Sequence, residues 1–80
     1  MAAVVENDLL SAQELAKLAH EQYHTIDYWS ERGILVFKRL GRKRFYGRES
    51  NLLRIRFTRE RQNRGHSIEG ILDEIHRQGF

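Results

Sequence analysis

The chain contains no cysteine among its 80 residues. That absence excludes a disulfide scaffold, a thiolate metal site and a thiol redox sensor, and it suits a reducing compartment. No apolar run is long enough to cross a bilayer, and residues 1–10 lack the basic start and long apolar stretch of a signal peptide. We therefore expect a cytoplasmic protein that is associated with the nucleoid if it binds DNA, and no membrane partner.

Eighty residues form one domain, and so small a core leaves little spare stability for a deep catalytic cleft. Hydrophobic residues make up 40% and charged residues 31%, a composition typical of a folded domain rather than a disordered chain. The pattern described below begins near residue 10. We expect a flexible N-terminal arm over residues 1–9 and a single domain over residues 10–80.

Positive charge is concentrated in the middle of the chain. The net charge is −4 over residues 1–37, +9 over residues 38–64 and −2 over residues 65–80, for a total of +3. Charge of this density suits a polyanionic partner, although most charge runs are solvated helix faces. Phe45 and Tyr46 interleave with the cations, which favours nucleic acid.

Two short helices are predicted in the first half. Ser11 and Glu14 form a capping-box pattern that starts a helix at about residues 12–19. A polar break at residues 20–22 separates it from a second helix that ends at about Arg32, before a glycine. Two short helices joined by a tight turn are the helix-turn-helix pattern.

Helical spacing sorts these side chains into inner and outer faces. The inner face of the first helix is expected to hold Leu15, Leu18 and Ala19. That of the second is expected to hold Tyr23, Ile26 and either Trp29 or Ser30, with tryptophan favoured for the core. The opposite face of the second helix carries His24, Asp27, Tyr28 and Glu31.

A hairpin and two more helices follow. Residues 34–37 predict a strand, residues 40–42 a turn and residues 43–46 the returning strand. Ser50 or Asn51 caps a third helix that runs to about residue 63. Ser67 caps a fourth, whose apolar stripe is core rather than a docking face: Ile68, Ile71, Leu72 and Ile75. The predicted fold is mainly α, a winged helix-turn-helix with four short helices and a two-stranded β-hairpin wing.

An ordered series of segments resembles a known family. Residues 15–19 (LAKLA) and 25–35 (TIDYWSERGIL) are similar to the helix-turn-helix of bacterial MerR-type transcription regulators. Residues 44–46 (RFY) look like the wing motif of that family. Residues 52–57 (LLRIRF) and 65–71 (GHSIEGI) look like its next two helices. No single motif is specific, but their order along nearly the whole chain is.

The resemblance implies sequence-specific binding of double-stranded DNA by a transcription regulator. The second helix would enter the major groove, with the wing on the phosphate backbone. It also implies action on RNA polymerase at a promoter and a homodimer formed through a region outside this chain. The predicted DNA-binding residues are His24, Thr25, Asp27 and Tyr28 on the helix, and Lys38, Arg39, Arg42, Lys43, Arg44 and Tyr46 on the wing.

The chain departs from the family pattern in the turn and the recognition helix. His20 replaces the usual turn glycine. Asp27 replaces a basic residue, and a carboxylate accepts a hydrogen bond from cytosine but repels phosphate. The wing is also short and lacks proline. Two alternatives therefore stay open, an excisionase-like architectural DNA-binding protein and a helix-turn-helix adaptor that binds protein.

An enzyme is not expected, nor is a cofactor or a metal. Residues 20–24 (HEQYH) match the zinc-protease pattern HExxH, which needs both histidines on one face of a continuous helix. Here the segment falls where the two helices must bend apart. The arginines of the third helix are a weaker case for DNA contact, and some are expected to pair with Glu60 or with the C-terminal acids.

Overall fold

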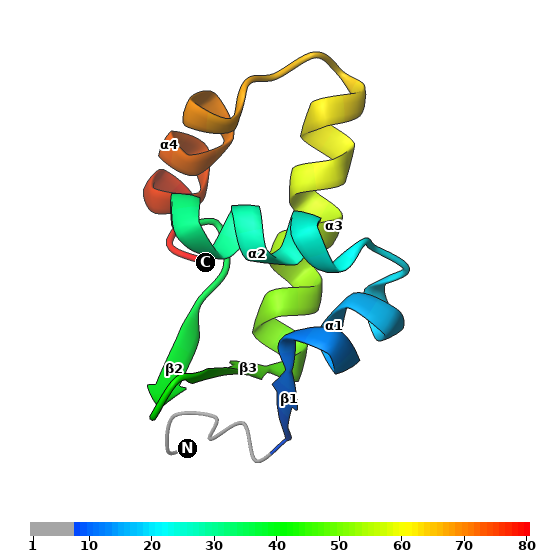
Figure 1. The fold of residues 1–80 in the computed structure, drawn as a ribbon. Helices are drawn as coiled ribbons and strands as arrows, with labels where there is room; N and C mark the ends of the chain where they lie inside the picture. Colours follow the sequence, from blue (N-terminus) through cyan, green and yellow to red (C-terminus); the bar gives the residue numbers. More distant parts are fainter. Residues whose placement is uncertain (1–7) are drawn as a thin grey trace.

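Seven elements follow one another in the structure, a computed structural model that describes residues 8–80. Figure 1 shows a small sheet at one end of the molecule and four helices around it. In chain order they are β1 (Leu9–Ser11), α1 (Ala12–Ala19), α2 (Tyr23–Arg32), β2 (Phe37–Leu40), β3 (Lys43–Gly47), α3 (Arg48–Asn63) and α4 (Ile68–Gln78). The predicted fold class, a mainly α winged helix-turn-helix with four helices, is confirmed.

The helix-turn-helix forms where the sequence predicts it. The Ser11 hydroxyl accepts from the Glu14 amide at 3.1 Å, and the Glu14 carboxylate accepts from the Ser11 amide at 2.9 Å. His20 ends α1 in the left-handed conformation, with φ 58° and ψ 41°. This turn separates the two histidines of the HExxH pattern, so they do not share the continuous helix that a zinc protease requires.

The sheet has three antiparallel strands in the order β1-β3-β2, one more than the sequence predicts. Residues Leu9 to Ser11 pair with the end of β3, so the predicted arm joins the sheet at Leu9. Residues 1–7 of that arm lie outside the described residues. Three residues are too few to show an alternating pattern, which is why β1 was missed.

The first strand of the hairpin begins later than expected. β2 starts at Phe37, whereas Ile34 and Leu35 lie in the preceding loop with both side chains buried. Successive side chains of a strand point to opposite faces, so two adjacent residues cannot both reach the same core from a strand. The prediction of a strand over residues 34–37 was therefore wrong. Residues that fill a core were mistaken for a strand.

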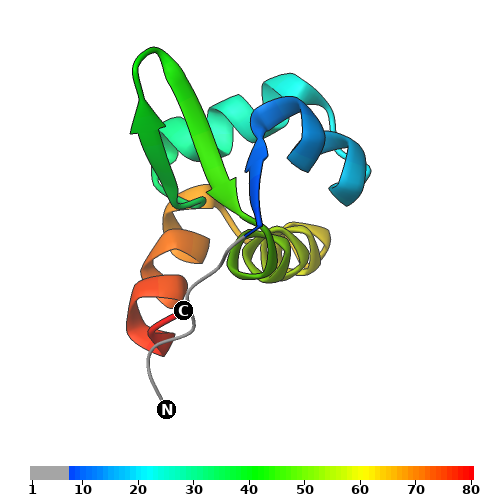
Figure 2. The ribbon, with the colours of Figure 1, turned by 90° about the horizontal axis from the view of Figure 1, so that it is seen from below.

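A two-residue turn closes the hairpin between Leu40 and Lys43. Gly41, the first turn residue, has φ 64°, and Arg42 does not have a positive φ. This is the φ pattern of a type II′ turn, whose twist matches that of the flanking strands. Figure 2 shows the resulting hairpin extending away from the helices as a wing.

One hydrophobic core joins all four helices to the sheet. The α4 stripe lies in it, with Ile71 and Ile75 buried, which confirms the prediction of a core face. Trp29 and Ser30 are both buried on α2. Two residues expected on inner faces, Leu18 and Tyr23, are exposed. The buried face of α1 centres on Leu15, Ala16 and Ala19, which leaves Leu18 on its flank, and Tyr23 lies at the very start of α2.

Helix α3 begins at Arg48, three residues before the predicted start, and Gly47 is its N-cap. Asn51 is not a cap, because its side chain is fully buried one turn inside the helix. Its amide oxygen accepts from the Val36 amide at 2.9 Å. Its amide nitrogen donates to the carbonyls of Val36 and Gly47 at 2.9 and 2.8 Å. Asn51 therefore holds the loop that leads into the wing.

Arg54 fixes the other side of that loop. Its guanidinium donates to the Ile34 carbonyl at 2.9 Å and to the Phe80 carbonyl at 2.7 Å. Burial lowers the pKa of Arg54, since desolvation disfavours the charged form. This arginine is a structural residue that joins the loop and the C-terminus to α3.

The left-handed His20 generates a stability prediction. A non-glycine residue in this conformation costs about 1 kcal/mol or more, so His20→Gly should raise the unfolding free energy by about that amount. For a domain of this size, that corresponds to a rise of roughly 4–8 °C in Tm. The matched control is His24→Gly, in the first turn of α2, which should lower stability by about 0.3 kcal/mol because glycine has a lower helix propensity than histidine. Thermal unfolding followed by circular dichroism measures both, and a lower Tm for His20→Gly would contradict the prediction.

Candidate nucleic-acid interface

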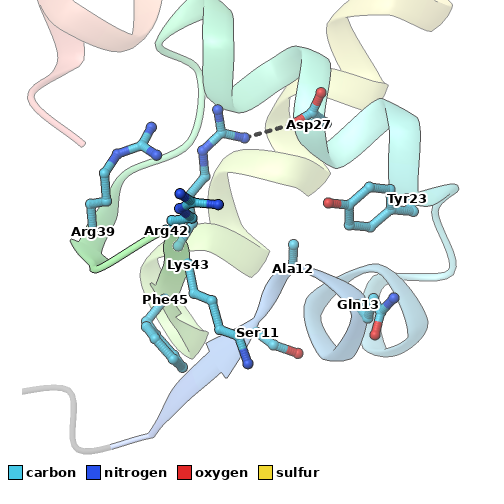
Figure 3. A pocket seen from close by; sticks show the side chains of 10 residues that line it. Ser11, Ala12, Gln13, Tyr23, Asp27, Arg39, Arg42, Lys43 and Phe45 are labelled. Carbon is cyan, nitrogen blue, oxygen red and sulfur yellow. Dashed lines mark hydrogen bonds and ion pairs between the residues drawn. The ribbon is translucent and has the colours of Figure 1, made fainter.

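A groove of about 470 Å³ separates the wing from the helix-turn-helix. One wall is the start of α1 and α2, and the other is the outer half of the hairpin (Figure 3). The Tyr23 hydroxyl points into the space between the walls. The lining residues are Ser11, Ala12, Gln13, Tyr23, Asp27, Arg39, Arg42, Lys43, Arg44 and Phe45.

The wing presents a set of cations that are exposed to solvent. Lys38, Arg39, Arg42 and Lys43 make no ion pair with any residue in the range 8–80, although Arg39 lies over the Phe37 ring at 5.8 Å. Three of the four line the groove. Their charge is available to an anionic partner, as the sequence predicts for them.

The arginines of α3 are largely engaged within the fold. Arg59 pairs with Glu21 and lies over the Trp29 ring at 5.1 Å. Its pKa is raised, chiefly by the hydrogen bond to Glu21. Arg61 bonds Glu60 at 2.7 Å and Glu74 at 2.9 Å, which confirms the expected pairing with Glu60 and a C-terminal acid. The positive middle segment is therefore divided between a structural helix and a solvent-facing wing.

Arg44 differs from the other wing cations because it is already paired. One of its nitrogens donates to the Asp27 carboxylate at 2.6 Å and another donates to Glu31. The guanidinium lies over the Phe37 ring, 4.9 Å from its centre. Burial lowers the pKa of Arg44, but the neighbouring Asp27, Tyr46 and Glu31 outweigh that effect and raise it. Arg44 thus connects β3 to two successive turns of α2.

Tyr46, predicted to contact DNA, lies in the core instead. Its side chain is fully buried, and its hydroxyl is 2.6 Å from the Ser30 hydroxyl. Ser30 gives its own proton to the Ile26 carbonyl at 2.7 Å, so Tyr46 is the donor to Ser30. A side chain without exposed surface cannot touch a duplex, and the prediction for Tyr46 was wrong. Strand alternation puts Arg44 and Tyr46 on one face but does not say which face is covered.

The outer face of α2 remains open beside the groove. His24 is exposed, Thr25 is half-buried and Tyr28 is 48% exposed. His24 and Tyr28 are four residues apart and so share one face of the helix. Arg32 lies 5.9 Å from the centre of the Tyr28 ring. These side chains form the part of the helix that a partner would meet.

A helix-turn-helix followed by a cationic hairpin defines the chain as a winged helix-turn-helix protein. Residues 10–77 match the family model described as MerR HTH family regulatory protein, and the chain belongs to that family. At family level it is a DNA-binding transcription regulator, in a family of regulators and not of enzymes. No curated protein and no solved structure matches the chain.

Two further features, a membrane-spanning helix and a metal-holding group of side chains, concern residues 8–80. No helix in this part of the chain is long and apolar enough to span a membrane. Nor does this range contain a group of three or more histidine and acidic side chains placed to hold a metal ion.

Removing the Tyr46 hydroxyl should affect stability and leave DNA affinity unchanged. Tyr46→Phe deletes one buried hydrogen bond and should lower the unfolding free energy by about 1 kcal/mol. The matched control is Tyr28→Phe, an exposed tyrosine, which should leave stability unchanged. Chemical denaturation measures the first quantity and a duplex titration the second. A large loss of DNA affinity in folded Tyr46→Phe would return this residue to the interface.

Proposed function

We propose that this protein binds double-stranded DNA sequence-specifically, with α2 in the major groove and the wing along the phosphate backbone. One observation carries the proposal. The groove lies between Tyr23 and Asp27 of α2 and the wing cations Arg39, Arg42 and Lys43, and the exposed His24 and Tyr28 each follow one of the two groove-lining residues of α2.

The dimensions fit a duplex. A helix with its side chains is about 10–12 Å across, and the major groove of B-DNA is about 12 Å wide. When α2 lies in the major groove of DNA, the DNA strand that borders this major groove runs between α2 and the wing. The groove beside Tyr23 provides the space, and Arg39, Arg42 and Lys43 provide the charge to neutralise its phosphates.

Each side chain then has a role of its own. His24, Thr25 and Tyr28 face base edges and the adjoining sugars. Lys38, Arg39, Arg42 and Lys43 contact phosphates, which position the protein without reading sequence.

Family membership also supports a wider proposal. The proposal includes action at a promoter together with RNA polymerase. It also includes a homodimer, formed through a region outside this chain, that binds two DNA half-sites. The alternative of a protein-binding adaptor rests on Asp27 and on the acidic first third of the chain. The pairing of Asp27 with Arg44 weakens the first of these two grounds.

A mobility-shift titration with random and genomic duplexes at physiological salt tests the proposal directly. A specific complex should form at a much lower concentration than the complex with random duplex, by a factor of about 10³ or more. No shift with any duplex would refute the proposal and leave the adaptor.

The salt dependence of binding should report the wing cations. If Lys38, Arg39, Arg42 and Lys43 neutralise four phosphates, the log–log slope of affinity against salt should be about −3.6. The double variant Arg42→Ala/Lys43→Ala should reduce its magnitude by about 1.8. The charge-matched control is Arg56→Ala/Arg64→Ala, two exposed arginines outside the groove. Equal slope changes in both double variants would show that only overall charge matters.

His24 should govern which sequence is bound. A side chain at a base edge contributes about 1–3 kcal/mol of discrimination. His24→Ala should therefore narrow the ratio of specific to random affinity about tenfold, with little change in random binding. Arg42→Ala should weaken both alike. Competition titrations against a selected duplex and a random duplex measure the ratio, and an unchanged ratio for His24→Ala would remove this residue from readout.

A further inference from the structure

Helix α2 carries two carboxylates toward the same region as the groove. Asp27 and Glu31 are four residues apart, so they lie one above the other on a single face. Like charges at this spacing destabilise a helix. On a helix that lies in a DNA groove, they would also repel the phosphates of the bordering strand. The acidic face of α2 therefore has to be neutralised before this helix suits DNA.

Arg44 is the residue that offsets part of this charge, with one cation against two carboxylates. The guanidinium lies between both carboxylates, 2.6 Å from the Asp27 oxygen, and the Phe37 ring lies beneath it. The Arg44 side chain is only 15% exposed, whereas Asp27 and Glu31 are 49% and 63% exposed. The cation is thus the most enclosed member of the cluster and is bonded to α2, although it also lines the groove.

We infer that Arg44 is a positioning residue that shields the acidic face of α2, and that it does not bind phosphate itself. This inference rests on the proposed DNA binding and refines it. One oxygen of Asp27 accepts a hydrogen bond from Arg44, so part of its negative charge is directed at the wing and not at DNA. The phosphate contacts come from the remaining wing cations, and their number sets the salt dependence.

The test is a set of charge variants. Arg44→Met keeps an unbranched apolar stem above Phe37 and uncovers both carboxylates. DNA affinity should fall about tenfold, because like charges are then brought together. The triple variant Arg44→Met/Asp27→Asn/Glu31→Gln contains neither the cation nor the carboxylates. Its affinity should return to within about threefold of the native chain, and its salt slope should equal the native one.

A matched control lies at the far end of α3. Arg61 also joins two carboxylates, those of Glu60 and Glu74, and it also lies over an aromatic ring, 4.4 Å from the centre of Phe57. It is 17% exposed and lies outside the groove. Arg61→Met should cost a similar loss of stability and leave DNA affinity unchanged. Thermal unfolding of every variant verifies that binding is compared between folded proteins.

The two possible roles of Arg44 give opposite results in the triple variant. A phosphate ligand would be missing from it, so its affinity would stay about tenfold low and its salt slope would be smaller in magnitude by about 0.9. That result would overturn the inference. Absence of duplex binding by the native chain would instead refute the proposed function. If Arg44→Met does not fold, Arg44→Lys replaces it. A lysine is a point charge that cannot bridge both carboxylates, so a partial loss of affinity is expected.

Discussion

The contact between β3 and α2 determines where the wing lies, and the rest of the site depends on it. Two side chains of β3, two residues apart, bond to α2. Tyr46 donates to Ser30 in the core, and Arg44 pairs with Asp27 and Glu31 at the rim. The hydrogen bond between Tyr46 and Ser30 is buried, and a shift of β3 relative to α2 would break it. The ion pair between Arg44 and Asp27 is part of the groove lining. The strand that anchors the wing therefore also shapes the surface offered to DNA.

Buried polar atoms support this contact from behind. The loop between α2 and the wing carries backbone groups that no helix or strand satisfies, and Asn51 and Arg54 from α3 satisfy several of them. A buried polar group left without a partner is costly, so these bonds hold the loop in one conformation. Helix α3 thereby fixes the start of the wing, although its own exposed face takes no part in the groove.

Local signals in the sequence predict local structure well. The capping box at Ser11, the break at His20 and the apolar stripe of α4 each consist of residues within the helix end or helix face that they predict. Tyr46 and Asn51 were placed wrongly because their partners are 16 and 15 residues away. Spacing along one segment carries no information on which neighbour will cover it. The family resemblance predicts the arrangement of the elements correctly, but it does not predict which individual side chains contact one another.

The charge pattern shows the same limit from the opposite direction. The net charge of +9 over residues 38–64 can be counted from the sequence. The electrostatic field that a DNA duplex meets depends on which of these cations are paired with carboxylates in the fold. The acidic flanks supply Glu21 from one side and Glu74 from the other, and these pair with two arginines of α3, Arg59 and Arg61. Asp27 and Glu31 occupy Arg44 in turn. Folding therefore pairs the arginines that join helices to one another and leaves the cations of the hairpin exposed, where a phosphate strand can reach them.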